Sequence, residues 1–318
     1  MKTAFFSFCV AATAFASGAA GLYAQQPNDH TRQKVRTVNI PISIYTKREL
    51  KQGQPEEMVE AQRLIVREDK DEQTILSIRS VTETPLALAV IIQDDLTSDF
   101  NLQLKDIKNF IRNLPRGSRV MVAYTRGGSL QIRQKFTDDL AKAADSLRIV
   151  YSNSSASPRN PYDGVVDALN RFDALPAGRR AILLVSDGLD TSAGNDASTP
   201  GESIDLDRAI MRAQRRSAAV FSIYSPTVVT ENAPSRLILN GQGSLEKLSD
   251  ETGGRAFFQG SIAPISYIPF FREISILLDR QFLLSYLSTH MKRGYHKIEV
   301  VSTNPEVKIE HPKGYFYR

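Results

Sequence analysis

Between residues 85 and 262, apolar runs of strand length alternate with segments of helical periodicity, and this alternation constrains the fold more than any other feature. The run Leu86–Ile92 is almost continuously apolar and stops at Gln93-Asp94-Asp95. Such a run is typical of a central parallel strand that is covered on both faces. Apolar residues then recur at helical spacing, at Leu104, Ile107, Ile111 and Leu114. A strand followed by a helix, repeated along the chain, predicts a doubly wound α/β sheet with ligands at the carboxyl ends of its strands.

The elements that follow keep to the same alternation. Further strands are expected at residues 119–124, 130–136, 181–186, 218–224 and 255–258, and further helices at residues 138–148, 163–173, 204–216 and 244–251. The pair Gly127-Gly128 is typical of a tight turn, so the strand after it is expected to pair antiparallel with the strand before it. The segment Gly241-Gln242-Gly243-Ser244 is interpreted as a loop that caps the next helix, because it lacks the third glycine of a phosphate-binding turn.

Both ends of the chain contain strand patterns without intervening helices. The N-terminal segment 37–84 has strand patterns at residues 38–44, 63–67 and 74–80. The C-terminal segment 263–318 has a helical pattern at 267–279 and then strand patterns at 281–287, 296–302 and 307–311. Strands without crossover helices do not extend a parallel sheet. We therefore expect the two end segments to pair with one another and form a small second β layer.

The first residues have the layout of a secretory signal peptide. Lys2 precedes an apolar and small stretch that ends at Ala24 and is followed by Gln25-Gln26. The stretch is too short and too interrupted to span a bilayer of about 30 Å. Cleavage after Ala24 is expected, with residues 25–36 as a flexible leader, although Leu22 leaves an uncleaved anchor as an alternative. The mature protein is thus expected to be secreted or periplasmic, without a transmembrane segment.

Cysteine and charge exclude several functions. The one cysteine, Cys9, lies in the expected signal peptide, so a mature chain would have no thiol chemistry. Loss of Lys2 leaves 39 basic and 35 acidic residues, a charge of about +4 that is spread along the chain. This is no nucleic-acid signature. Four arginines share one side of a predicted helix, either as a solvated face or as a contact for an anionic partner: Arg208, Arg212, Arg215 and Arg216.

Three acidic residues fall where a doubly wound fold places its ligands. Asp94 follows the first strand, Asp187 follows the strand at 181–186, and Asp163 stands at the start of the intervening helix. Because the carboxyl ends of neighbouring parallel strands share one crevice, these residues are expected to converge. Asp95, Asp99 and Asp190 are interpreted as exposed loop charges.

At these positions the chain resembles the von Willebrand factor A family, whose D-x-S-x-S loop, threonine loop and late Asp-Gly hold a divalent metal. Asp94 and Ser98 match the first loop, but Leu96 stands at the first serine. Asp163 stands at the threonine position, and Asp187 matches the late loop. The resemblance implies a degenerate metal-ion-dependent adhesion site formed by Asp94, Ser98, Asp163 and Asp187, for Mg²⁺ or alternatively Mn²⁺ or Ca²⁺.

Three motifs nearer the C-terminus resemble the von Willebrand factor A-related subgroup that is abundant in acidobacteria. They are Thr252-Gly253-Gly254-Arg255-Ala256-Phe257, Phe282-Leu283-Leu284-Ser285-Tyr286 and Lys313-Gly314-Tyr315. The resemblance implies an exported binding or adhesion module of a bacterial envelope. Its partner would be a protein or an envelope-surface ligand, contacted by the loops at 152–162 and 192–203.

Two interpretations of the acidic residues stay open. In one, the site is modified: Leu96 removes a hydroxyl ligand, and Asp163 adds a charge that neutralises an ion without an acidic partner. In the other, the site has decayed, and its acids cap helices or face solvent, with Asp163 as the N-cap of the helix after it. A metal-free structural subunit of an envelope assembly fits the second interpretation.

Enzyme functions find little support in the sequence. G-x-S-x-G, P-loop and H-E-x-x-H motifs are absent, and none of the four histidines, His30, His290, His296 and His311, is near Asp94 in sequence. A doubly wound phosphatase would need a second aspartate at position 96, where the chain has leucine. We therefore expect a protein that is not an enzyme.

Overall fold

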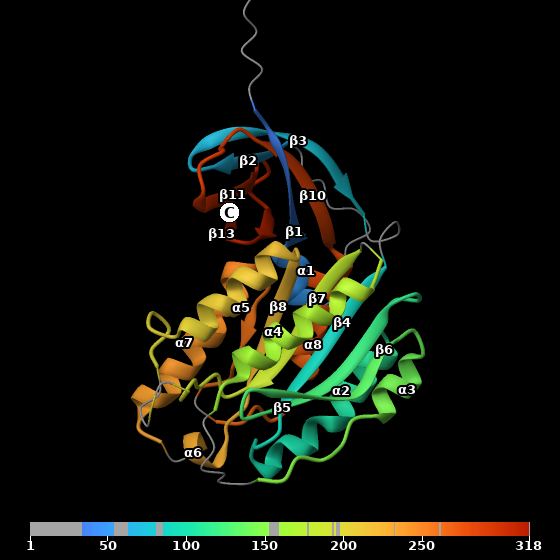
Figure 1. Ribbon diagram of the computed structural model, residues 1–318. Coiled ribbons are helices and arrows are strands. Elements are labelled where there is room, and N and C mark those ends of the chain that lie inside the picture. Colours follow the sequence, from blue (N-terminus) through green and yellow to red (C-terminus); the bar gives the residue numbers. More distant parts are fainter. Residues whose placement is uncertain are drawn as a thin grey trace, which may run out of the picture. The chain divides into compact units, whose positions relative to one another are not determined.

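The computed structural model describes residues 34–53, 63–80, 85–152, 159–176, 178–192, 194, 198–231, 233–260 and 262–317. Residues Lys34–Arg318 form one compact unit that contains two sheets (Figure 1). The expected signal peptide and the leader as far as residue 33 lie outside the described residues. Within the described part, no helix is both long and apolar enough to cross a membrane.

The first sheet confirms the α/β prediction. Its strand order is β6-β5-β4-β7-β8-β9. The strands are β4 (Leu86–Gln93), β5 (Arg119–Arg126), β6 (Ser129–Thr137), β7 (Arg179–Ser186), β8 (Ala218–Tyr224) and β9 (Ala256–Phe257). All neighbouring pairs are parallel except β5 and β6, which form the antiparallel hairpin expected at Gly127-Gly128.

Helices cover both faces of this sheet. Successive side chains of a strand point to opposite faces, and every residue of β4 is buried, so both faces must be covered. One face of the sheet packs on α2 (Leu104–Arg112), α3 (Leu140–Asp145) and α8 (Ile268–Asp279). The opposite face packs on α4 (Pro161–Arg171), α5 (Ile204–Arg215) and α7 (Ser235–Thr252). The shorter helical segments are α1 (Lys47–Gln52), η1 (Ser98–Gln103), η2 (Phe172–Ala174) and α6 (Val228–Glu231). The near-continuous apolar strand thus has the two-sided cover that its sequence predicts.

Two expectations about helix ends are wrong. Helix α4 begins at Pro161, and its N-cap is Asn160, whose side chain accepts hydrogen bonds from the amides of Tyr162 and Asp163. Asp163 therefore lies in the first turn and is not the cap. Gly241-Gln242-Gly243-Ser244 lies inside α7 and is not a loop.

The glycine inside α7 has a packing role. A Cβ atom on Gly241 would collide with the carbonyl oxygen of Asp187. A Cβ atom on Gly188, which has φ of +71°, would likewise collide with the carbonyl oxygen of Gly241. The two glycines therefore allow helix α7 to approach the end of β7, and this close approach outweighs the poor helix propensity of glycine.

The second sheet joins both ends of the described chain, as predicted. It is antiparallel, with the order β12-β1-β10-β3-β2-β11-β13. Its N-terminal strands are β1 (Arg36–Thr46), β2 (Leu64–Glu68) and β3 (Asp71–Arg79). Its C-terminal strands are β10 (Gln281–Ser288), β11 (Gly294–Ser302), β12 (Val307–Glu310) and β13 (Gly314–Tyr317), the last of which was not expected from the sequence. Strand β1 begins at Arg36, inside the segment expected to be a flexible leader.

This terminal sheet must curve, as Figure 1 shows. Strands β11 and β12 are consecutive in sequence but are five strand spacings apart in the sheet order. In a flat sheet these spacings amount to about 24 Å. The connection from Ser302 to Val307 spans at most about 18 Å. Curvature brings the two edges together around a core that includes Ile40, Ile42 and Leu284.

Arg255, between α7 and β9, connects the two sheets. Its guanidinium pairs with Glu310 of β12 and with Glu273 of α8, and it donates to the hydroxyl of Tyr45 in β1. Burial and the Glu310 carboxylate raise the pKa of the Tyr45 hydroxyl, so this residue stays a neutral donor to Glu310. A residue of the α/β sheet thus binds both chain ends.

Candidate functional site

Asp187 lies at the carboxyl end of β7 and is fully buried. One carboxylate oxygen accepts from the amide of Leu189 at 3.1 Å and the other from the hydroxyl of Thr227 at 2.8 Å. Burial raises the pKa of Asp187 to about 6, and the nearby Asp95 carboxylate adds to the rise. A buried acid with a raised pKa at the end of a central strand is a feature of functional crevices.

The two acids after β4 each contact an arginine. Asp94 Oδ1 lies 2.7 Å from Arg148 Nη2, and this guanidinium also stacks over the ring of Tyr124. Asp95 Oδ2 lies 2.9 Å from Arg159 Nε, and both of these side chains are largely buried. Asp95 and Asp190 were expected to be exposed loop charges, and both expectations are wrong, since Asp190 is also buried. The charge of Asp95 acts on Asp187.

Asp163 in the first turn of α4 also has a basic partner. Its Oδ1 lies 2.8 Å from Arg208 Nη2 of α5, and its Oδ2 accepts from the side-chain amide of Asn160 at 3.0 Å. Burial and the neighbouring Asp205 carboxylate raise the pKa of Asp163, while Arg208 lowers it. Arg208, expected to lie on a free basic helix face, is therefore paired with two acids, Asp163 and Asp205.

Ser98 and Leu96, the other two positions of the loop that was compared with D-x-S-x-S, differ in burial. Ser98 begins η1 and is exposed. Leu96, at the position of the expected hydroxyl ligand, is fully buried in the core between the sheet, α2 and α8. Its backbone also bridges to Thr227. Leucine at position 96 therefore has a packing role in this chain.

These contacts bear on whether a divalent ion fits the predicted ligands Asp94, Ser98, Asp163 and Asp187. Within the described residues, the three carboxylates are not among those that share a metal-sized space. An ion that joined them would have to displace the guanidiniums of Arg148 and Arg208. The structure therefore supplies internal cations for Asp94 and Asp163, and the ligand set stays a prediction.

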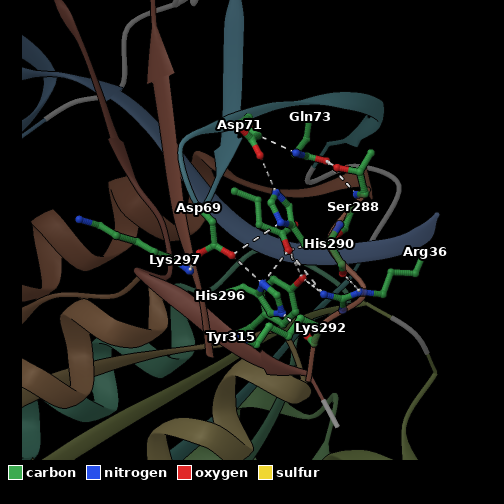
Figure 2. Close-up of polar contacts among 12 residues, drawn as sticks. Arg36, Asp69, Asp71, Gln73, Ser288, His290, Lys292, His296, Lys297 and Tyr315 are labelled. Atoms are coloured by element: carbon green, nitrogen blue, oxygen red, sulfur yellow. Dashed lines mark hydrogen bonds and ion pairs between the residues drawn. The ribbon is translucent and has the colours of Figure 1, made fainter. Parts of the chain in front are cut away.

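One group in the described residues does have the spacing of metal ligands, and it lies in the terminal sheet. It consists of Asp69, His290 and His296, whose ligand atoms lie within 4.8 Å of one another (Figure 2). In the sequence, neither histidine is near Asp69 or Asp94. The predicted pairing of the end segments could have indicated this group, because that pairing brings the turn after β2 beside β10 and β11.

Comparisons with known proteins bear on the fold alone. No family model matches the sequence. No curated protein matches it either. Among solved structures, the chain is similar to an aerotolerance-related membrane protein from Bacteroides fragilis, with 12% identity, a TM-score of 0.44, and 61% of this chain and 98% of that chain covered. BatB from Bacteroides thetaiotaomicron is similar with 14% identity, a TM-score of 0.43 and coverage of 60% and 95%.

A von Willebrand factor type A structure from Catenulispora acidiphila covers more of the chain. It has 12% identity and a TM-score of 0.43, and the match spans 92% of this chain and 75% of that chain. The α/β fold class rests on the strand order and the helix cover of this chain itself.

Proposed function

We propose that this chain is an exported, non-enzymatic binding protein whose von Willebrand factor A-like domain presents its strand-end surface to a protein or envelope-surface ligand. The observation that carries the proposal is the neutralisation of the strand-end acids by arginines. Asp94, Asp95 and Asp163 each contact a guanidinium at 2.7 to 2.9 Å. A crevice with these internal ion pairs supports binding without a metal, which makes the adhesion site degenerate.

Exposed apolar side chains on the segments that follow the strand ends provide a contact surface. Leu102 of η1, after β4, has 76% of its surface exposed, and Leu239 at the start of α7 has 65% exposed. Val228 and Val229 of α6, which follows β8, are also exposed. Contiguous patches of exposed apolar side chains mark protein contact sites, and these four side chains are the candidates for such a patch at the strand ends.

The binding surface can be tested by capture from native envelope, using crosslinking and mass spectrometry. The variant Leu102→Asn combined with Leu239→Asn should lose the captured partner, because two exposed apolar contacts are replaced by polar side chains. Leu76→Asn in β3 is the matched control, since Leu76 is 50% exposed but belongs to the terminal sheet. Equal capture by both variants would contradict the proposed surface.

The role of metal can be tested separately by melting temperature. A site with three unpaired carboxylates would bind Mg²⁺, Mn²⁺ or Ca²⁺ and raise the melting temperature with the logarithm of metal concentration. Because arginines already pair with the acids, we expect no rise at millimolar Mg²⁺ or Ca²⁺ and capture that persists in a chelator. A rise that disappears in Asp163→Ala or Asp187→Ala would instead support the modified metal site.

A further inference from the structure

The turn between β2 and β3 holds Asp69 in a fixed position. Glu68 and Asp71 pair across the hairpin, so the loop consists of Asp69 and Lys70 alone. Both have positive φ, +50° and +81°, which matches the tight hairpin turn that favours Asn-Gly or Asp-Gly. A lysine at such an angle is uncommon, and conformations of this kind concentrate at functional sites.

His296 of β11 faces this turn from a buried position. Its ring stacks on Tyr315 of β13, and only 4% of the residue is exposed. Nε2 lies 2.7 Å from the carbonyl oxygen of Lys292, which only accepts, so Nε2 carries a proton. Nδ1 lies 2.8 Å from Asp69 Oδ2. Figure 2 shows the ring between these two partners.

Asp69 is ionised at neutral pH. Burial alone would raise the pKa of this carboxyl, but the amide of Lys297, which donates to Oδ1 at 2.8 Å, and the neighbouring His296 hold the pKa below its usual range. A carboxylate oxygen and an imidazole nitrogen therefore face one another at 2.8 Å. The two atoms are close enough to be ligands of one ion.

His290, in the connection between β10 and β11, completes the group. Its Nδ1 lies 3.9 Å from Asp69 Oδ2, and its Nε2 lies 3.2 Å from Asp71 Oδ2. In a tetrahedral zinc site, bonds of about 2.0–2.1 Å place ligand atoms about 3.3 Å apart. The distances from Asp69 Oδ2 to the two Nδ1 atoms bracket this value.

Both imidazoles also have an oxygen acceptor close to their second nitrogen. A metal-ligating histidine directs its second nitrogen to a carboxylate or a backbone carbonyl, which fixes the ring and the tautomer. Nε2 of His296 lies 2.7 Å from the Lys292 carbonyl oxygen, and Nε2 of His290 lies 3.2 Å from Asp71 Oδ2 without making a hydrogen bond to it. The buried Glu68 carboxylate lies 3.4 Å from His296 Nδ1 and is itself bound by Tyr315 and Ser288.

We propose that Asp69, His290 and His296 form a binding site for a divalent transition metal of the Zn²⁺ type, with Asp71 orienting His290. Two imidazoles and a carboxylate favour such an ion over Mg²⁺. Three protein ligands leave one position of a tetrahedral ion open, and the partial exposure of Asp69 lets water fill it. The ion would fasten the β2–β3 turn to the β10–β11 connection and so stabilise the pairing of the two chain ends.

The probe for this site is Zn²⁺ alone, titrated calorimetrically into the full mature chain. The protein is purified without a histidine tag and stripped with a chelator at neutral pH. We expect one Zn²⁺ per chain and a melting temperature that rises with Zn²⁺. His290→Gln and Asp69→Asn should weaken binding more than about 100-fold, and Asp71→Asn about tenfold.

The control is Glu72→Gln, which removes an exposed charge of β3 beside the turn and should leave binding unchanged. Circular dichroism checks that each variant is folded, and Asp71→Asn serves where a ligand variant unfolds. Absence of Zn²⁺ binding by the parent chain would overturn the proposal. Binding that survives His290→Gln but is lost in Asp187→Ala would place the ion at the strand-end crevice and would also overturn it.

Discussion

Single residues decide what the strand-end crevice can bind. Asp94, Asp95 and Asp163 each contact an arginine, whereas Asp187 is enclosed among neutral donors. Ionisation of Asp187 therefore lowers the free energy of unfolding. Its pKa of about 6, against 3.8 for the free group, means that the folded chain keeps a proton which the unfolded chain has released between about pH 4 and pH 6. The stability that this proton contributes is present at low pH and is lost as pH rises through about 6.

We predict that Asp187→Asn gains stability relative to the parent chain as pH rises from about 4 to above 6, by about 1–3 kcal/mol. Asparagine is neutral at every pH and keeps an oxygen that accepts a hydrogen bond. Chemical denaturation across this pH range gives the difference between the two proteins. Asp173→Asn is a control, because Arg216 lowers the pKa of Asp173 and the stability that depends on its charge therefore changes mainly below about pH 4, outside this range. A stability difference that does not depend on pH would show that ionised Asp187 does not destabilise the fold.

At the scale of elements, two glycines allow close packing between α7 and the end of β7. Gly241 and Gly188 place the helix backbone against the Asp187-Gly188 turn. The glycines at 241 and 243 look equivalent in the sequence, but their surroundings differ. A Cβ atom at 243 would meet only Pro200 Cγ, at 3.1 Å.

We therefore predict that Gly241→Ala lowers the free energy of unfolding by more than about 2 kcal/mol, although alanine is the better helix former. Gly243→Ala should stay within about 1 kcal/mol of the parent chain, because the proline ring can shift. Urea denaturation of both variants provides the comparison. Equal effects of the two substitutions would mean that α7 does not pack as closely as the structure shows.

At the scale of the whole molecule, the stability of the α/β sheet depends on both chain ends. Helix α8 belongs to its core, and Arg255 binds side chains from β1 and β12. The Ser217 hydroxyl also donates to the carbonyl of Asn39 in β1. Removal of the terminal sheet would take Tyr45 and Glu310 from Arg255, which would keep Glu273, and would take the Asn39 carbonyl from Ser217.

A truncated chain of residues 85–262 should therefore melt at a lower temperature than the mature chain and bind a hydrophobic dye. Residues 85–280, which retain α8, separate the contribution of that helix from the contribution of the terminal sheet. We expect 85–280 to be more stable than 85–262 but less stable than the mature chain. If 85–280 resisted heat as well as the mature chain, the coupling through Arg255 would contribute nothing.

The sequence alone determined the α/β class, the β5–β6 hairpin and the pairing of the chain ends, because apolar periodicity is a local property that follows burial. It did not determine how α4 begins, that Gly241 lies inside α7, or which acid lies near Asp187. These depend on contacts between residues distant in sequence, as in the pair Asp95 and Arg159. The group of Asp69, His290 and His296 was equally hidden, since more than 200 residues separate the aspartate from the histidines. Only the register of the terminal sheet places them within reach of one ion.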